Sequence, residues 1–396
     1  MPHRCARGRD TQMKIRRVMA IVALSLCCAL IPGKAVYLAH ADDQACDTLP
    51  TAVAHHEAGS RPQHIFIIVL ENESYNETFG PTSEAPYLSK CLTRKGQLLT
   101  NYYAIGHFSL DNYIAMISGQ SPNPETQLDC PIFDDLALTK PGLDDNGQAA
   151  GHGCVYPADV KTIANQLEEK HLKWRGYMED MSGTCQHPVV GEADLHEKAT
   201  KDSQYATKHN PFVYFHSLSE EDCKANDVPL TQLESDLGTV ESTPNLSFIV
   251  PNLCNDGHDH KNGKCADNKT PGGLVAIDSF LRRAVPMIMN SKAYQQDGML
   301  IITFDEADIE GDERDARPCC SEPTGPNTQL PGMFGLGGGK IGTVIISPFV
   351  KPGVPNAKSY NHYSLLRSLE NLFGLSHLGY AEKPDPGEFG IDVYNQ

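Results

Sequence analysis

The sequence predicts an α/β fold with a largely parallel central sheet. Short apolar runs of strand length recur along the chain, and segments with helical periodicity separate several of them. Residues 65–70 (Ile-Phe-Ile-Ile-Val-Leu) are continuously apolar, which is typical of a strand buried on both faces. With 396 residues the chain can bury a large core, either as one big α/β domain or as two ordinary ones.

The N-terminus predicts an export signal over residues 1–41. Lys14, Arg16 and Arg17 precede the apolar residues 18–31, and residues 39–41 (Ala-His-Ala) offer a small-x-small cleavage site. The apolar run is short for a membrane span and no later stretch is long enough, so we expect no stable membrane insertion. Residues 42–62 are polar and contain proline, which indicates a loose lead-in to a single domain over residues 63–396. We expect a secreted or periplasmic protein.

The charge of the chain argues against nucleic acid as a partner. The net charge is −17, and residues 1–41 hold seven of the 33 basic residues but only one of the 50 acidic ones. Residues 42–396 therefore carry a net charge of −23, which disfavours nucleic acid and anionic membranes. Small phosphates remain compatible, because a metal ion or a local histidine cluster can invert the field at one site.

Cysteine usage agrees with export. Ten cysteines follow residue 41, an even number that suits disulfides in an oxidising compartment. No CxxC pair occurs, so we expect no thiolate zinc site. We expect the adjacent Cys319 and Cys320 to pair with different partners.

The predicted elements alternate along the chain, with three long loops between them. Short apolar runs predict strands at residues 65–70, 98–104, 173–177, 212–215, 246–250, 299–304 and 343–347. Apolar residues at helical spacing predict helices from residue 109, at 160–170, at 273–291 and at 363–373. Gly119 and Gly374 are expected to end the first and last of these helices. Residues rich in Gly, Asp, Pro or polar side chains predict loops at 130–156, 184–207 and 323–339.

Two hypotheses fit Ser109, at the start of its helix. Serine is a favoured N-cap, so Ser109 would simply cap a helix whose apolar face includes Leu110, Ile114 and Ile117. Alternatively Ser109 is a nucleophile, because a helix N-terminus also offers free N–H groups and positive potential to a phosphate.

Polar groups follow nearly every predicted strand. Since ligands gather at the carboxyl ends of parallel strands, these side chains are expected to meet. They are carboxylates, amides and imidazoles, with one serine: Glu71, Asn72, His107, Ser109, His216, Asp256, His258, Asp305 and Glu306. His209 lies just ahead of the strand predicted at residues 212–215.

Hard oxygen donors with histidine and no thiolate suit Mg²⁺, Ca²⁺, Mn²⁺ or a His/Asp zinc site. A cation held by Glu71, Asn72, Asp305 and Glu306 would activate Ser109 and neutralise phosphate oxygens. The histidines would bind the phosphate or protonate the leaving oxygen.

Seven stretches together resemble the secreted phosphoesterase family of bacterial acid phosphatases and phospholipases C, within the alkaline-phosphatase superfamily. They occur in family order at residues 68–75, 106–113, 173–181, 209–212, 251–259, 302–306 and 362–370. The resemblance implies a three-layer sandwich of the alkaline-phosphatase type, with residues 63–396 as one phosphoesterase catalytic domain.

The resemblance also implies a role for each matching residue. Glu71, Asn72, Asp305 and Glu306 would bind one divalent metal, and Ser109 would be both metal ligand and nucleophile, forming a phosphoserine. The groups expected to hold the phosphoryl group or assist the leaving group are His107, His258 and His362 as catalytic residues and His209, Asp256 and Asn112 as substrate-binding residues.

Two positions depart from the family pattern. Asp111 stands where relatives usually have proline, and we expect it to pair with a histidine or to narrow the substrates accepted. Asp256 and His260 have the spacing of two-zinc relatives, and with His362 would complete a second metal site. However, Glu306 replaces the histidine of those enzymes, so we favour one metal.

The leading expectation is an exported phosphomonoesterase of the acid phosphatase type that acts on small phosphate esters. A phospholipase C-like phosphodiesterase is the alternative, disfavoured because the chain ends about twenty residues after the last motif and shows no membrane-docking stretch. A third hypothesis is a binding protein on a retired enzyme scaffold, against which the intact Ser109 and carboxylates argue.

Overall fold

The computed structural model describes residues 46–50, 61–259, 263–309, 314–385 and 387–395. The predicted export signal, parts of the lead-in and His260 lie outside the described residues. The described residues all belong to one compact unit. Within the described ranges, no helix combines the length and the apolar character needed to cross a membrane.

The described residues form an eight-stranded central sheet. In spatial order its strands are β12 (Asn356–Asn361), β2 (Gln97–Tyr103), β11 (Thr343–Ile346), β10 (Gly298–Phe304), β1 (His64–Leu70), β9 (Leu246–Val250), β6 (Trp174–Met178) and β8 (Asp227–Pro229). Every residue of β1, β9 and β10 is buried, as the continuous apolar runs predict. Only β11 runs against its neighbours, pairing antiparallel with both β10 and β2. The sheet is therefore largely parallel, as expected.

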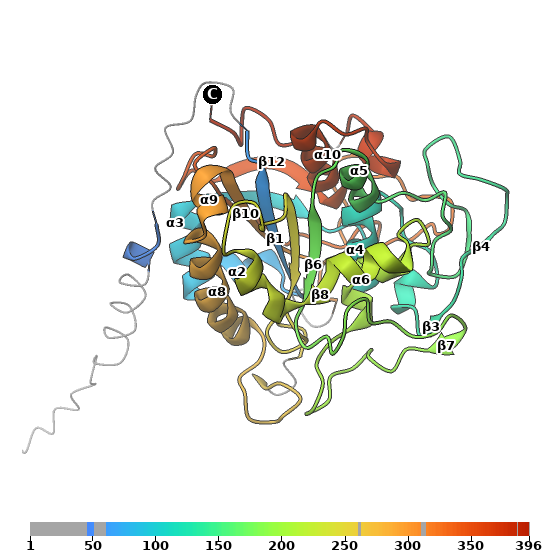
Figure 1. The fold of residues 1–396 in the computed structure, drawn as a ribbon, viewed down its shortest axis with the longest axis horizontal. Helices are drawn as coiled ribbons and strands as arrows, with labels where there is room; N and C mark the ends of the chain where they lie inside the picture. Colours follow the sequence, from blue (N-terminus) through green and yellow to red (C-terminus); the bar gives the residue numbers. More distant parts are fainter. Residues whose placement is uncertain (1–45, 51–60, 260–262, 310–313, 386, 396) are drawn as a thin grey trace, which may run out of the picture. The chain divides into compact units, whose positions relative to one another are not determined.

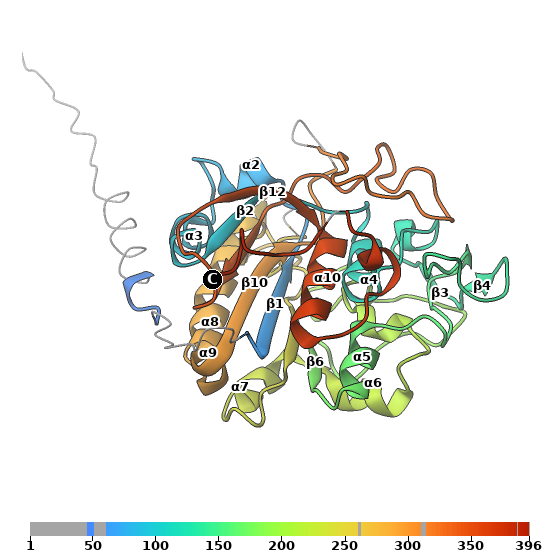
Figure 2. The ribbon, with the colours of Figure 1, turned by 90° about the horizontal axis from the view of Figure 1, so that it is seen from above.

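Helices cover both faces of this sheet, which gives three layers (Figures 1 and 2). On one face lie α8 (Leu274–Met289) and α9 (Lys292–Asp297), and on the other α4 (Ser109–Ser118), α5 (Ile163–Glu169) and α10 (His362–Phe373). Shorter elements complete the fold: α2 (Tyr75–Phe79), the π-helix Tyr87–Leu92, α3 (Thr93–Lys95), α6 (Glu220–Asn226), α7 (Leu233–Asp236), β3 (Ile132–Phe133), β4 (Ala137–Leu138), β5 (Gly151–His152), β7 (Glu192–Ala193) and the 3₁₀ turns Thr126–Leu128, Thr207–His209, Pro211–Tyr214, Leu230–Gln232 and Gly379–Glu382.

Helix α4 is buried all round, since each of its ten residues is shielded from solvent. Gly119 ends it in the left-handed conformation (φ 68°), as predicted. A Cβ at Gly119 would also lie 2.3 Å from the carbonyl oxygen of Leu378, so only glycine fits there. The expectation that Ser109 caps the helix is wrong: Ser109 is already helical, and Phe108 is the N-cap.

Three predictions about elements differ from the structure. The strand predicted at residues 212–215 is wrong: residues 211–214 form a 3₁₀ turn, and the fixed φ of Pro211 suits the first position of a helical turn. The apolar residues of this turn still join the core, where Phe212 stacks on Trp174. Strands β8 and β12 were not predicted, since β12 is polar (Asn-Ala-Lys-Ser-Tyr-Asn) and half exposed at the sheet edge.

All ten described cysteines form disulfides, as their even number predicts. The pairs are Cys46–Cys91, Cys130–Cys154, Cys185–Cys223, Cys254–Cys265 and Cys319–Cys320. The expectation that Cys319 and Cys320 take different partners is wrong, because the other eight described cysteines pair among themselves.

We expect Glu370→Gln in α10 to stabilise the protein more at high pH than at low pH. Glu370 is fully buried, and its Oε1 accepts the Leu378 N–H at 2.8 Å while Oε2 has no partner. Burial raises the pKa of Glu370 from 4.5 to about 9, so the folded state holds a proton that the unfolded chain releases between these values. The free energy of unfolding of the wild type therefore falls as the pH rises from 4.5 to about 9. The variant does not show this fall, because glutamine cannot ionise. Thermal unfolding at about pH 5 and about pH 8 measures the difference, and an equal gain at both would contradict it.

Candidate active site

The site is assembled where β1, β9 and β10 end. Strands β1 and β10 run in register to Leu70 and Phe304, so Glu71 and Asp305 emerge side by side. The Asp305 N–H donates to the Leu70 carbonyl at 2.9 Å, and the Glu71 N–H donates to the Asp256 carbonyl at 2.9 Å. Three fully buried carboxylates are thereby brought to one edge of the sheet, as the parallel topology predicts.

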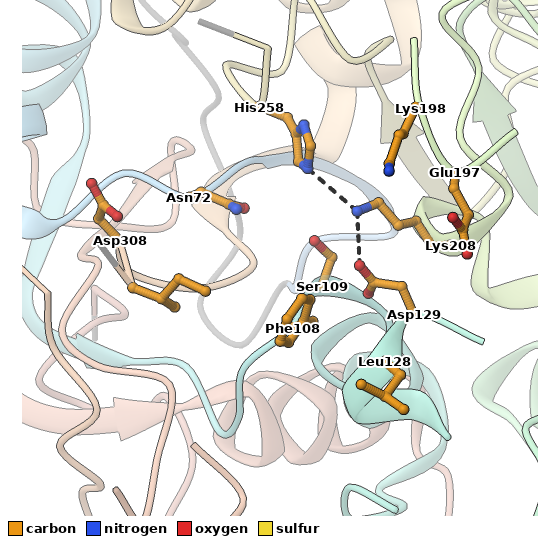
Figure 3. A pocket seen from close by; sticks show the side chains of 11 residues that line it. Asn72, Phe108, Ser109, Leu128, Asp129, Glu197, Lys198, Lys208, His258 and Asp308 are labelled. Atoms are coloured by element: carbon orange, nitrogen blue, oxygen red, sulfur yellow. Dashed lines mark hydrogen bonds and ion pairs between the residues drawn. The ribbon is translucent and has the colours of Figure 1, made fainter. Parts of the chain in front are cut away.

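Ser109 lies against this group. Its Oγ donates a hydrogen bond to Oε2 of Glu71 at 3.0 Å, and the Tyr113 hydroxyl, one turn further along α4, donates to Oε1. Ser109 also lines a cavity of about 390 Å³ together with Phe108, Asp129 and other side chains (Figure 3). A buried serine that opens onto a cavity and contacts a carboxylate is placed as a nucleophile would be.

The α4 N-terminus is less available to a ligand than the sequence suggests. The Leu110 N–H, which would point at a bound phosphate, donates instead to Oδ1 of Asp129 at 3.1 Å. A carboxylate at this position complements the positive end of the helix dipole.

The donor set fits a divalent cation. Burial raises the pKa of Glu71, and the charges of Asp305 and Asp256 raise it further. Burial also raises the pKa of Asp305 to about 6, and Oδ2 of Asp305 has no hydrogen-bond partner. Clustered buried carboxylates repel one another unless a cation or protons lie between them.

Asn72 supports the same interpretation. It follows Glu71 in a left-handed conformation (φ 47°), which asparagine tolerates, and its N–H donates to Oδ1 of Asp305 at 3.1 Å. Its side-chain oxygen faces Oε2 of Glu71 at 2.9 Å and Oδ1 of Asp305 at 3.3 Å. Either the amide turns over and donates to both carboxylates, or a cation lies among these oxygens.

The buried Glu306, the fourth predicted metal ligand, contacts His107. Nδ1 of His107 is hydrogen-bonded to Oε2 of Glu306, and Nε2 donates to the Asp315 carbonyl at 2.8 Å. Both ring nitrogens of this buried histidine are thus engaged, and burial lowers its pKa. In the structure His107 positions Glu306 and does not line the cavity beside Ser109.

His209 lies between two carboxylates. Its Nε2 is 3.4 Å from Oε2 of Glu71 and its Nδ1 is 3.3 Å from Oδ2 of Asp256. These three residues place ligand atoms within 4.8 Å of one another, so they form a second group able to contribute to a metal site. Burial holds the pKa of His209 well below its ordinary value, and its ring stacks on Tyr113.

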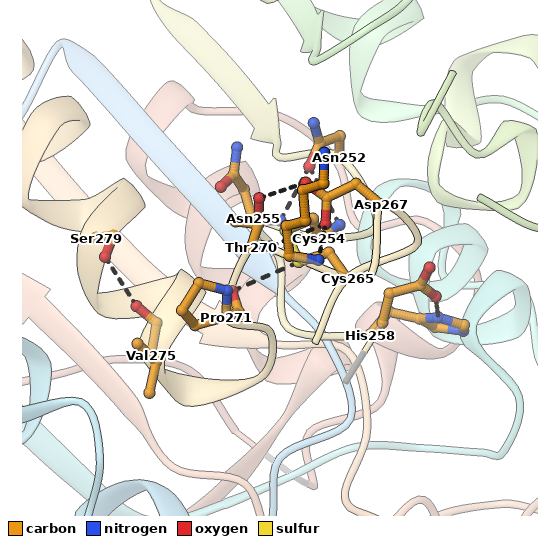
Figure 4. Close-up of a disulfide and its surroundings, with 12 residues drawn as sticks. Asn252, Cys254, Asn255, His258, Cys265, Asp267, Thr270, Pro271, Val275 and Ser279 are labelled. Carbon is orange, nitrogen blue, oxygen red and sulfur yellow. Dashed lines mark hydrogen bonds and ion pairs between the residues drawn. A yellow bond between two sulfur atoms is a disulfide. The ribbon is translucent and has the colours of Figure 1, made fainter. Parts of the chain in front are cut away.

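His258 reaches the cavity from the loop after β9. Its N–H donates to Oδ1 of Asp256 at 2.8 Å, and its ring contributes to the cavity wall. Asn252 organises the start of this loop by accepting the Cys254 N–H, and the Cys254–Cys265 disulfide joins it to the segment before α8 (Figure 4). Burial lowers the pKa of His258, and the charge of Lys208 lowers it further.

His362 supports the site from behind. Its Nε2 donates to the Asp305 carbonyl at 2.6 Å, and its Nδ1 accepts the Tyr102 hydroxyl at 3.3 Å. Burial lowers the pKa of His362 to about 4, so the imidazole is neutral. His362 therefore fixes the backbone that carries Asp305.

Asn112 fixes the loop that precedes Ser109. Its oxygen accepts the N–H groups of Ile105 and Gly106, and its nitrogen donates to the carbonyls of Gly106 and Phe108. Both amide hydrogens are used to position this loop, and substrate binding by Asn112 stays a prediction.

Asp111 contacts no histidine, which corrects one of the two expectations for it. Both carboxyl oxygens are buried without a hydrogen-bond partner, close to Gly106. Burial raises the pKa of Asp111, and the charges of Glu306 and Asp129 raise it further. Burial among these charges therefore favours the neutral form of the Asp111 carboxyl group.

Sequence reasoning missed three residues at this site. Lys208 and Asp129 line the cavity and form an ion pair, and Tyr113 bonds Glu71. The i,i+4 spacing from Ser109 placed Tyr113 on the same helix face and was an available signal. Lys208 adjoins His209, but nothing in the sequence connects it to Asp129, which lies 79 positions away.

Fold and site together define a class: an α/β protein with a buried serine among carboxylates at the carboxyl ends of parallel strands. The model of the phosphoesterase family matches residues 81–376. The chain belongs to the phosphoesterase family, a family of phosphoric ester hydrolases.

Relatives of known name agree with this assignment. The chain is 30% identical over 305 residues to the phosphate-repressible acid phosphatase of Penicillium chrysogenum, covering 77% of this chain and 58% of that relative. It is 25% identical over 323 residues to the phosphatidylinositol-3-phosphatase of Mycobacterium tuberculosis, covering 82% and 81%. The chain spans less than two thirds of the length of the fungal relative.

Among solved structures, the lipoteichoic acid synthase LtaP of Listeria monocytogenes superposes with a TM-score of 0.48 at 11% identity, covering 89% of this chain and 82% of that one.

Proposed function

We propose that this protein is an exported, metal-dependent phosphomonoesterase of the acid phosphatase type that acts through a phosphoserine at Ser109. The observation that carries the proposal is the hydrogen bond from Ser109 Oγ to Glu71 at 3.0 Å, in the wall of a cavity beside buried carboxylates. Two relatives named as phosphatases, an acid phosphatase and a phosphatidylinositol-3-phosphatase, support the choice of substrate class.

In this proposal Ser109 attacks the phosphorus of a small phosphate ester. The bond between Ser109 Oγ and phosphorus forms as the bond to the alcohol oxygen breaks, and the serine proton passes to Glu71. The alcohol oxygen takes a proton from protonated His258, the imidazole on the cavity wall among the described residues, and His258 recovers a proton from the water that attacks in the second step. Water then releases phosphate from the serine and restores the enzyme.

One divalent cation (Mg²⁺, Ca²⁺, Mn²⁺ or Zn²⁺), when bound by Glu71, Asn72, Asp305, Ser109 and Glu306, would lower the pKa of the serine and neutralise charge on the phosphoryl oxygens. The chain's own residues hold this site rigid. Tyr113 fixes the carboxylate of Glu71, and His362 fixes the backbone of Asp305. Asn112 fixes the loop ahead of Ser109, so the nucleophile is pre-positioned.

Export is part of the proposal. Five disulfides among the described cysteines suit an oxidising compartment, and residues 1–41 have the composition of an export signal.

A hydrolysis panel tests the proposed reaction. Purified protein is freed of metal, resupplied with each divalent cation in turn, and assayed on p-nitrophenyl phosphate, bis-p-nitrophenyl phosphate and phosphatidylcholine. We expect the monoester to be turned over fastest. Faster turnover of either diester would favour the phospholipase C-like alternative, and no turnover of any substrate by metal-loaded protein would favour a binding protein.

A further inference from the structure

The cavity beside Ser109 has a buried cation in its wall. The side chain of Lys208 is only 8% exposed, and its ammonium group donates to Oδ2 of Asp129 at 2.8 Å. It also contacts Nε2 of His258 at 3.3 Å (Figure 3). Figure 3 shows this ammonium on the cavity side, between His258 and Ser109.

The hydrogen bonds fix the direction of each donor. An ammonium group can only donate, so Nε2 of His258 accepts and its proton lies on Nδ1. That nitrogen is 3.0 Å from Oδ1 of Asp259 and donates a hydrogen bond to it. Lys208 therefore holds His258 in one tautomer, and Nε2 of His258 offers no hydrogen to an anion in the cavity.

The charge around the cavity requires a cation there. Glu71, Asp256 and Asp305 are fully buried beside it, so a phosphate that enters meets negative potential. Burial lowers the pKa of Lys208, but the charges of Asp129, Glu71 and Glu306 more than compensate and keep the ammonium protonated. Lys198 also lines the cavity, but its side chain is exposed to solvent, which screens its charge.

A purely structural ion pair explains less. Burying two charges is costly, and well-packed apolar side chains often stabilise a protein as well or better. Capping of α4 needs only Asp129, whose Oδ1 accepts the Leu110 N–H. A purely structural ion pair explains neither why the ammonium group of Lys208 lies at the cavity wall nor why it contacts His258.

We propose that Lys208 binds the phosphoryl group of the substrate, with Asp129 and His258 holding its ammonium in place when the cavity is empty. An ammonium group has three hydrogens, and the two contacts leave one for a phosphoryl oxygen. When a phosphoryl oxygen also takes over the hydrogen now directed at Nε2 of His258, that nitrogen is free to take up the proton that it later gives to the alcohol oxygen. The inference rests on the proposed function for the identity of the ligand, and its test does not depend on turnover.

The test measures binding of inorganic phosphate to metal-loaded protein by calorimetry. Since a hydrogen bond to a charged group contributes about 1.5–3 kcal/mol, Lys208→Met is expected to weaken phosphate binding about 10- to 100-fold. Lys208→Arg, which keeps the charge, is expected to restore part of the affinity. Lys198→Met is the matched control, and loss of its screened charge is expected to weaken binding less than about threefold.

A second variant separates binding from folding. Lys208→Met leaves Asp129 buried without its partner, so the double variant Lys208→Met/Asp129→Asn removes both charges together. Asparagine suits the left-handed conformation of residue 129 (φ 58°) and can still accept the Leu110 N–H. We expect the double variant to unfold at a temperature near that of the wild type and still bind phosphate weakly.

Two outcomes would overturn the assignment: wild-type phosphate affinity in the double variant, or equal losses from Lys208→Met and Lys198→Met. Failure of the proposed function looks different. In that case wild-type protein hydrolyses none of the esters, while the phosphate-binding comparison still decides the role of Lys208.

Discussion

Ser109→Ala is expected to abolish turnover of a phosphate monoester while leaving the protein folded. Removal of the nucleophile of a catalytic unit typically lowers kcat on the order of 10⁴- to 10⁶-fold. The Ser109 hydroxyl donates a hydrogen bond to Glu71, and the Tyr113 hydroxyl still holds that carboxylate in the variant. The expected change in the thermal midpoint is therefore small.

Ser118→Ala is the matched control for this variant. Ser118 lies at the other end of α4, equally buried, and its Oγ donates to the Ile114 carbonyl at 2.7 Å. If loss of any buried hydroxyl group in α4 impaired the enzyme, both variants would lose turnover. If Ser109→Ala keeps wild-type kcat, or if Ser118→Ala loses as much activity, Ser109 is not the nucleophile.

The sequence predicted the inner strands of the sheet for a physical reason. Strands β1, β9 and β10 are buried on both faces, so they must be apolar throughout and are visible as continuous runs. The edge strand β12 pairs on one side only and is half exposed, so its polar sequence carries no such mark. The antiparallel direction of β11 depends on the path of the chain after β10, which local composition does not encode.

In the candidate site, too, some residues could be located from the sequence and some contacts could not. Glu71, Asp256 and Asp305 follow buried strands directly, so finding the strands located the carboxylates. The pairing of Lys208 with Asp129 depends on two short turns meeting across the cavity, and no periodicity connects them. The hydrogen bonds from His362 and Asn112 to distant backbone groups could not be predicted, because only the folded chain brings these groups within reach.

Metal removal is expected to have an effect comparable to loss of Ser109. Chelation should reduce monoester turnover to background, and one divalent cation per chain should restore it. The physical reason is the cluster of buried carboxylates, in which Oδ2 of Asp305 has no hydrogen-bond partner and the side-chain oxygen of Asn72 faces Glu71 and Asp305. A cation that binds only the folded state also stabilises it, by about 2.7 kcal/mol at a free concentration of 100 times its Kd. The thermal midpoint should therefore fall on chelation and recover on resupply.

Asp305→Asn gives this prediction a residue-level test. The change removes a charge but little volume, and since loss of a supporting group alone weakens metal binding 10- to 100-fold, we expect loss of this ligand to weaken it at least about 100-fold. Glu370→Gln is the control for replacing a carboxyl group by an amide at an equally buried position, because Glu370 lies in α10 outside the predicted metal ligands. The control should keep the metal stoichiometry and the chelation-dependent shift of the thermal midpoint, and Asp305→Asn should lose both.

Two ions per chain would replace the one-metal assignment with a site that also uses Asp256 and His209. An Asp305→Asn variant that binds metal as tightly as the wild type would place the cation elsewhere.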